Sequence, residues 1–399
     1  MKSIGVFIMA LADRWLLPDG MKELLPPVAR EVELVRRRVL DLFHGWGYEL
    51  VMPPVAEHLE SLLTGVGGDL GLRTFKVTDE TSGHMLGIRA DITPQVARID
   101  AHRLRSDGVS RLCYCGSVLH TRAVNMLASR NPMQIGAELF GHEGVDSDAE
   151  VIALMLDTLL QVGVKGAINL DLGHVGVFTE LVAEAGLSES EITSYIDILE
   201  RKALPELAQF VAQLDQSDAV KNKLAALGTL NGSEQALDRA RELFADNAAI
   251  LAAVDHVAAI ADRVKTAHPS IGIYIDLGEL RGYSYHTGVV FAAYSPKFGQ
   301  ALAKGGRYDQ IGADFGRARP ATGFSADLKT LVTLALDEVP QPGLAILAPK
   351  MEDSSLILAV AALRAQGERV VYELDNAAAP AHCNRRLVKE NSEWTVTTL

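Results

Sequence analysis

Strand-like and helix-like segments follow one another in this chain of 399 residues without regular alternation until about residue 340. Short apolar runs bounded by glycine, proline or polar residues predict strands, and apolar residues spaced three and four apart predict helices. A parallel sheet built from β-α-β units requires regular alternation. The order of segments therefore predicts an α+β fold, in which helices flank an antiparallel sheet, followed by a small α/β unit.

Several strands and helices are predicted in the first 180 residues. Pro27 to Phe43 has the apolar spacing of a helix, and the segment YELVMPPV that follows is predicted as a strand. Thr93 and Pro94 are predicted as the N-cap and first residue of another helix. Other strands are predicted in TFKVTDETSGHMLGIRADITP (two around a turn), RLCYCGSVLHTRA, NPMQIGAELFG and GAINLDLGHVGVF.

Residues from about 187 to 264 are rich in Ala, Leu, Glu and Asp and have a helical pattern almost throughout. Strands are predicted again in IGIYIDLG and YHTGVVFAAY, so the helical stretch is interpreted as an insertion. GGRYDQIGADFG is predicted as a turn and the start of a helix, and PATGFSADLKTLVTLALDEV as a strand that runs into a helix.

The last segment follows a VPQPG linker and contains GLAILAPK, DSSLILAVAALRAQG and RVVYELD, which together predict one β-α-β unit. We therefore expect two domains, one at residues 1–335 with the insertion at about 187–264, and a small C-terminal α/β domain at residues 340–399.

Composition and charge bear on possible partners and on the cellular compartment. The formal net charge of −13 argues against a surface that binds nucleic acid as a whole. Cys113, Cys115 and Cys383 are predicted to be reduced thiols, as expected of a cytoplasmic protein. No apolar run approaches the ~20 residues of a membrane span. The apolar run near the N-terminus is too short for a secretory signal. We therefore predict that the first residues are a disordered extension or the product of an early start codon, with Met9 as the true start.

The segment LGELRGYSYHTGVVF, Leu277 to Phe291, combines one arginine, one histidine, two tyrosines and three glycines. Such a segment suits a bulged strand. It equally suits a pocket wall, where glycine lets a ligand approach the backbone and arginine binds an anion. The residues alone leave both interpretations open.

Several segments, in order, resemble those of histidyl-tRNA synthetases, which are class II aminoacyl-tRNA synthetases. GYELVMPPVAEHLE is similar to motif 1, the dimer motif, with Pro54 as its proline, and RLCYCGSVLHTRA…ASRNPMQIGAELFG is similar to motif 2. LRGYSYHTGVVF resembles the histidine-recognition segment, GGRYDQIG the glycine-rich segment after it, and PATGFSADLKTL stands where motif 3 belongs. The resemblance covers about residues 17–335 and implies a class II synthetase-like sheet.

Two segments, IRADITPQVARI and MQIGAELFG, resemble a paralogous family more closely. That family comprises the regulatory subunits of ATP phosphoribosyltransferase, which accompany a short catalytic subunit in histidine biosynthesis.

The resemblance implies a pocket for free histidine. Within it, Asp91 can accept from an α-ammonium, Arg281 can bind a carboxylate, and Glu138 can accept from an imidazole N–H. The implied histidine-binding residues are Asp91, Thr93, Gln134, Glu138, Arg281, Tyr285 and His286. The last of these replaces an aromatic residue, usually tyrosine, which leaves its contribution open.

Structural roles compete with each assignment. Asp91 could pair with Arg89 or Arg98, and Thr93 could act only as an N-cap. Glu138 could be a satisfied core carboxylate. Arg281 could belong to a structural ion pair, and Arg307 could bond turn carbonyls.

The phosphate-binding groups of the synthetases are replaced. Where motif 2 has Phe-Arg-x-Glu, this chain has Leu119 to Arg122, with His120 at the arginine position. Where motif 3 ends in Glu-Arg, it has Lys329 and Thr330. A retained amino-acid pocket without these arginines implies a non-catalytic regulatory subunit, with no catalytic residue, cofactor or metal site.

By the same resemblance, the partners are the short catalytic subunit, free histidine and a second copy of the chain. Residues 340–399 contain six Lys/Arg and seven Asp/Glu, which does not favour tRNA as a partner. The alternatives are a divergent histidyl-tRNA synthetase or another class II-like adenylate-forming ligase, both of which need the motif 2 arginine.

We expect the purified chain to show no histidine-dependent ATP–pyrophosphate exchange. Removing one donor to a developing negative charge typically lowers a rate by roughly 10²–10³-fold, and here two cationic donors are replaced. Exchange at the rate of an authentic histidyl-tRNA synthetase, assayed in parallel, would contradict the regulatory interpretation.

Overall fold

The computed structural model describes residues 15–64, 68–123, 128–164, 166–280, 282–283, 285–335, 344–375, 378, 380 and 382–399. The chain forms two compact units: among the described residues, the larger contains residues 15–24 and 32–335, and the smaller contains residues 25–31 and those from 344 onwards. The segment before Met9, predicted as an extension or a product of an early start codon, lies outside the described residues, and so does Arg281. Within the described part of the chain, no helix is both long and apolar enough to span a bilayer.

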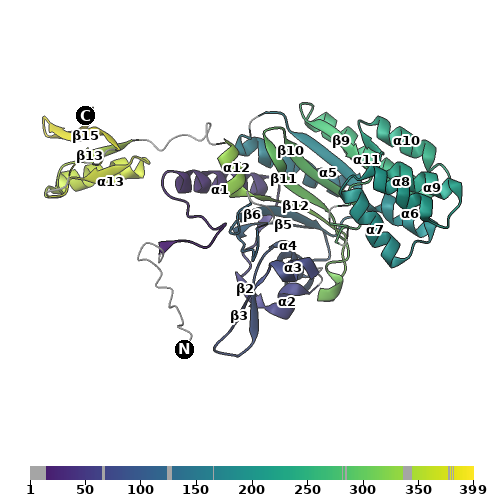
Figure 1. The fold of residues 1–399 in the computed structure, drawn as a ribbon. Helices are drawn as coiled ribbons and strands as arrows, with labels where there is room; N and C mark the ends of the chain where they lie inside the picture. Colours follow the sequence, from purple (N-terminus) through teal and green to yellow (C-terminus); the bar gives the residue numbers. More distant parts are fainter. Residues whose placement is uncertain are drawn as a thin grey trace, which may run out of the picture. The chain divides into compact units, whose positions relative to one another are not determined.

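A mixed sheet organises the larger unit (Figure 1). Among the described residues it has nine strands, in the order β1 (Glu49–Leu50), β5 (Ser110–Ser117), β6 (Met133–Phe140), β12 (Ala321–Asp327), β11 (Phe298–Arg307), β10 (Val289–Ser295), β7 (Asn169–His174), β9 (Gly272–Asp276) and β8 (Asn231–Gly232). The strands from β5 to β7 pair antiparallel, whereas β1 with β5 and β7 with β9 pair parallel. The predicted α+β class, with a largely antiparallel sheet and flanking helices, is confirmed.

One face of this sheet is covered by α1 (Val28–Gly45), α5 (Val145–Val162) and α12 (Leu328–Ala335). In α1 the buried residues Val35, Val39 and Phe43 recur every four positions, which places them on one side of the helix. The ring of Phe43 meets Phe324 of β12 edge-on, with 6.1 Å between centroids. Because side chains alternate along a strand, the neighbours of Phe324 in β12 point to the opposite face.

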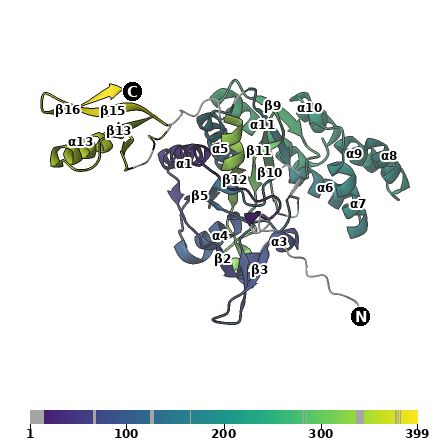
Figure 2. The same ribbon diagram turned by 60° about the vertical axis from the view of Figure 1, so that its left-hand side comes forward.

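A small antiparallel sheet consists of β2 (Ala56–His58), β4 (Met85–Ile88) and β3 (Phe75–Thr78). The short helices α2 (Leu59–Leu63), α3 (Gly68–Arg73) and α4 (Thr93–Arg98) accompany it, and a π-helix (Ile99–Leu104) follows α4. Figure 2 shows this sheet beside α3 and α4, apart from the insertion helices.

Two local predictions need correction. The strand predicted in YELVMPPV does form, at the edge of the large sheet, but it is shorter than predicted: its ladder ends before Pro53 and Pro54, because prolines cannot donate to a ladder. Their carbonyls accept instead from side chains: Pro53 from Arg89 Nη1 at 2.7 Å and Pro54 from Gln95 Nε2 at 2.9 Å. Thr93 is the first residue of α4 and not its N-cap, since its hydroxyl is used elsewhere.

The helical insertion lies between β7 and β9. It contains α6 (Val175–Ala185), α7 (Glu189–Glu200), α8 (Leu204–Gln213), α9 (Asp218–Leu227), α10 (Gln235–Leu243) and α11 (Ala248–Ala267). The sequence places its start at residue 187 and misses α6, because Val175 to Phe178 is apolar and β-branched enough to suit a strand. The chain turns instead at His174, whose Nδ1 accepts from the N–H of Gly176 at 3.1 Å and caps the helix.

Strand β11 also departs from the prediction. GGRYD was predicted as a turn, but Gly305 and Gly306 lie inside the strand. A β-carbon on Gly305 would lie 2.1 Å from the carbonyl oxygen of Gly323, so the close contact and not a turn requires glycine here. The predicted helix start after it is only a 3₁₀ turn, Ala313–Phe315.

The smaller unit has a four-stranded sheet in the order β14 (Val370–Tyr372), β13 (Ala345–Ala348), β15 (Cys383–Glu390) and β16 (Glu393–Thr398), with helix α13 (Ser354–Ala365). Strands β13 and β14 pair parallel around α13, so the predicted β-α-β unit is confirmed. Strands β15 and β16 were not predicted. Their polar, partly exposed residues carry only a weak apolar alternation, and Leu387 supplies their buried core residue.

Candidate functional site

Polar side chains from several predicted positions gather on the sheet face opposite α1. Gln134 of β6 donates through Nε2 to Oδ1 of Asp91 at 2.8 Å and accepts from the N–H of Ile92 at 2.8 Å. Oδ1 of Asp91 also accepts from the N–H of Thr93 at 2.9 Å. The carboxylate is therefore oriented by amide groups.

The predicted alternative, an ion pair from Asp91 to a nearby arginine, is wrong, because both arginines bind elsewhere. Arg89 donates to the carbonyl oxygen of Ser117 at 2.9 Å, and Arg98 donates to Glu57 at 2.5 Å.

Glu138 of β6 is the most buried acid of this cluster, with 1% of its surface exposed. Its Oε1 accepts from the hydroxyls of Thr93 and Tyr114, each at 3.0 Å, and Tyr308 donates to its Oε2. Sequence reasoning missed both tyrosines. Tyr114 could have been found, because it lies on a predicted strand and alternation places it on one face with Gly116. Tyr308 was missed together with the end of β11.

Glycines on neighbouring strands bring these side chains onto the backbone. A β-carbon on Gly323 of β12 would lie 1.5 Å from Oε2 of Glu138, and one on Gly306 of β11 would lie 2.5 Å from Cδ2 of His286. The two glycines are register partners. The carboxyl group of Glu138 and the imidazole of His286 therefore lie directly on the backbone of β12 and β11.

Tyr285 and His286 extend the cluster. The ring of Tyr285 stacks on Tyr308, with 5.2 Å between centroids, and meets His286 edge-on at 5.4 Å. The hydroxyl of Tyr285 is buried, and within the described residues it has no hydrogen-bond partner. Leaving such a group unpaired costs about 1–3 kcal/mol, so it favours a polar ligand atom.

The structure therefore brings together Asp91, Thr93, Gln134, Glu138, Tyr285 and His286. The seventh predicted residue, Arg281, lies outside the described residues, and ligand binding by the whole set stays a prediction.

Burial controls the electrostatics of the cluster. It raises the pKa of Glu138 to about 8, although the hydroxyl donors act in the opposite direction. Burial also raises the pKa values of Tyr114, Tyr285 and Tyr308 well above the ordinary tyrosine value. The ligand-free cluster is thus a set of hydrogen-bonding groups around a buried carboxyl group that holds a proton more tightly than an exposed one does.

The residues at the phosphate-binding positions are engaged within the protein. His120 is 8% exposed and its Nε2 lies 2.9 Å from the carbonyl oxygen of Ala90. Burial lowers the pKa of His120, so its imidazole is neutral at pH 7. Thr330 donates to Asp327 at 2.6 Å, and Lys329 donates to the carbonyl oxygen of Asn131 at 2.6 Å.

Arg130, a cation close to His120, is also engaged within the protein: it donates to the carbonyl oxygen of His120 at 3.0 Å and to that of Asp19 at 2.9 Å.

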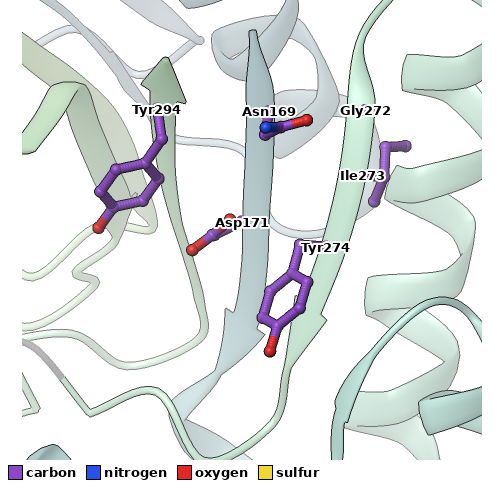
Figure 3. A pocket seen from close by; sticks show the side chains of 6 residues that line it. All are labelled: Asn169, Asp171, Gly272, Ile273, Tyr274 and Tyr294. Carbon is purple, nitrogen blue, oxygen red and sulfur yellow. The ribbon is translucent and has the colours of Figure 1, made fainter. Parts of the chain in front are cut away.

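An open cavity of about 600 Å³ lies elsewhere on the sheet, over β7, β9 and β10 (Figure 3). Its lining residues are Asn169, Asp171, Gly272, Ile273, Tyr274 and Tyr294. Its polar groups are spread over three strands and face open solvent, whereas a small-ligand site encloses convergent groups. The cluster around Glu138 is the better candidate. In the described portion of the chain, no group of three or more His, Cys, Asp or Glu side chains is placed to hold a metal ion.

The raised pKa of Glu138 predicts a pH dependence of folding stability. An acid whose pKa is higher in the folded than in the unfolded chain stabilises the fold fully below the unfolded value, and this contribution is lost as the pH rises from about 4.5 to about 8. Between pH 5 and 8 the free energy of unfolding of the wild type should therefore fall relative to that of Glu138→Gln. Urea unfolding of both proteins across this range tests it, and parallel pH profiles would contradict it.

Comparisons with known proteins agree with these observations. The family model of histidyl-tRNA synthetases matches residues 20–331, and the model described as the ATP phosphoribosyltransferase subunit HisZ C-terminal domain matches residues 342–397. The ATP phosphoribosyltransferase regulatory subunit of Thioalkalivibrio sulfidiphilus is 53% identical over 98% of this chain and 100% of its own length. The protein of the same name from Stutzerimonas stutzeri is 51% identical over the same shares.

Solved structures give the same picture. An ATP phosphoribosyltransferase regulatory subunit/histidyl-tRNA synthetase from Bacillus halodurans has a TM-score of 0.81 at 26% identity, over 93% of this chain and 96% of that one. The histidyl-tRNA synthetase of Nostoc sp. PCC 7120, at 16% identity, shares the fold with a TM-score of 0.76 over 96% and 97% of the two chains. With a synthetase-like sheet, a HisZ-type C-terminal unit and full-length relatives above 50% identity, the chain belongs to the family of ATP phosphoribosyltransferase regulatory subunits.

Proposed function

We propose that this chain binds a short ATP phosphoribosyltransferase catalytic subunit, activates it, and senses free histidine through the cluster around Glu138. The supporting observation is a contrast within one site. The hydrogen-bonding groups for an amino acid lie together, whereas His120 and Thr330, at the phosphate-binding positions, are engaged with Ala90 and Asp327.

The alternatives fit less well. An active histidyl-tRNA synthetase or another adenylate-forming ligase needs a cation at the position of His120, and burial keeps that imidazole neutral. The names of the full-length relatives also favour a regulatory role over a synthetase.

In this proposal the activity belongs to the partner, which joins ATP and phosphoribosyl pyrophosphate into phosphoribosyl-ATP and releases pyrophosphate. The chain can activate that reaction only by binding the active conformation of its partner more tightly than the inactive one. Histidine, as end product, would bind here and favour the inactive state of the complex.

Further parts of the proposal follow from the same resemblance. The chain self-associates through the segment around Pro54, where Leu50, Met52 and Val55 are exposed. It does not bind tRNA, and residues 1–335 and 340–399 act as separate domains. A cytoplasmic location is supported by three cysteines that are all free thiols.

Complex formation tests the proposal most directly. Mixing the purified chain with the short catalytic subunit should give a stable complex and faster formation of phosphoribosyl-ATP, and saturating histidine should reduce that rate. The catalytic subunit alone is the control. If no complex and no stimulation occur, the regulatory proposal fails for this pair. Stimulation that is insensitive to histidine removes only the sensing role.

Histidine binding can be measured separately by calorimetry. Removing one partner of a charge-assisted hydrogen bond costs about 1.5–3 kcal/mol, so Arg281→Ala and Glu138→Ala should each weaken binding at least roughly tenfold. Arg317→Ala is a suitable control, because Arg317 forms an exposed ion pair with Asp107. Unchanged affinity in both pocket variants would place the histidine site elsewhere.

A further inference from the structure

A buried ion pair lies at the border between the sheet and the helical insertion. Asp148, in the first turn of α5, is fully buried and binds Arg307 of β11 through both carboxylate oxygens, at 3.1 Å from Nε and 3.0 Å from Nη2. Its Oδ2 lies 2.8 Å from Nε2 of His256. His256 belongs to α11, the last helix of the insertion. The pair therefore links the insertion to the sheet.

The acceptor in this pair is a charged carboxylate. Burial alone would raise the pKa of Asp148, but the hydrogen bond from His256 and the guanidinium of Arg307 hold it below its usual value. A buried carboxylate depends on each of its donors, because it cannot regain water when one is removed. We therefore expect loss of the His256 bond to change how Asp148 holds Arg307, its charged partner.

Arg307 links the buried ion pair to the candidate pocket, which is the cluster around Glu138. Its Nη1 donates to Oδ1 of Asp309 at 3.1 Å, and Oδ2 of Asp309 accepts from the hydroxyl of Thr287 at 3.0 Å. The N–H of Thr287 donates in turn to the carbonyl oxygen of Arg307 at 2.7 Å. Thr287 directly follows His286 in the chain. Tyr308 lies between Arg307 and Asp309, and its hydroxyl donates to Glu138.

The beginning of the insertion reaches the same segment. The N–H of Val175, the first residue of α6, donates to the carbonyl oxygen of Gly288 at 3.0 Å. The aliphatic part of Arg307 packs on Gly288, where a β-carbon would lie 2.9 Å from Cδ of the arginine. The ring of His174, just before α6, meets that of His256 with 5.5 Å between centroids. The first helix of the insertion is thus attached directly to the short pocket segment that contains Tyr285 to Gly288, and the last helix reaches that segment through Asp148 and Arg307.

We propose that His256 is a positioning residue for the candidate histidine pocket, and that it couples the helical insertion to the pocket through Asp148, Arg307, Asp309 and Thr287. This inference rests on the proposed histidine-binding function. His256 touches no ligand. It positions the carboxylate of Asp148, which binds Arg307, and Arg307 in turn holds the pocket segment. Because coupling between sites is reciprocal, a partner that displaces α11 changes histidine affinity, and histidine changes the stability of the α11 contact.

The experiment compares two substitutions in the same helix pair. His256→Leu removes the bond to Asp148, whereas His256→Gln keeps a donor at nearly the same place. The control is His268→Leu, because His268 follows α11 and its Nε2 lies at the same 2.8 Å distance from an aspartate of α5, Asp157, far along the helix from the pocket segment.

Calorimetry should show histidine binding weakened at least about fivefold by His256→Leu, the lower end of typical coupling. Binding should be near wild type in His256→Gln and in His268→Leu. Combining His256→Leu with Thr287→Val should weaken binding by less than the product of the two single effects, because both act on one network. Equal weakening by His256→Leu and His268→Leu, or none by His256→Leu, would overturn the coupling.

Hydrogen exchange without ligand separates this inference from the proposed function. The amides of Thr287 and Val175 are protected by bonds to Arg307 and Gly288. They should exchange faster in His256→Leu than in wild type or His268→Leu. A wild type that binds no histidine refutes the sensing function, yet faster exchange in His256→Leu alone would still support the positioning role. Unchanged exchange would refute it.

Discussion

The carboxyl group of Glu138 is placed where it can neither reach water nor move. It lies against the backbone of Gly323, and three hydroxyl groups donate to it. A carboxyl group in such a place survives only if its hydrogen bonds are complete, since an unpaired buried polar group is costly. That requirement fixes Thr93 at the start of α4, Tyr114 on β5 and Tyr308 at the end of β11, so one acid determines how three separate segments meet.

Part of the fold was predictable from local apolar patterns. Helix α1 and the strands β5 and β6 were predictable, because their apolar spacing reflects one buried face. Gln134 and Glu138 could be placed on one face by alternation alone. Resemblance to the synthetases was needed to join them with Tyr285, because no periodic signal links β6 to a segment about 150 residues later.

The failures have local physical causes. At Gly305 and Gly306 the sequence pattern predicts a turn, but these glycines serve close contact between strands, which depends on a neighbour distant in sequence. The segment that begins at Val175 forms a helix although its residues suit a strand, because the imidazole of His174 caps that helix. Such tertiary partners override local propensity, and a single sequence does not reveal them.

Strands β7 and β9 are parallel neighbours, which gives the insertion between them a topological meaning. Two parallel strands cannot be joined by a tight turn and need a crossover of roughly a dozen residues or more. The six helices α6 to α11 are therefore an enlarged crossover and not a domain threaded into a loop. The length of this connection does not affect the pairing of β7 with β9, but the connection cannot be removed while β9 stays beside β7. The insertion is thus also an obligatory link of the sheet.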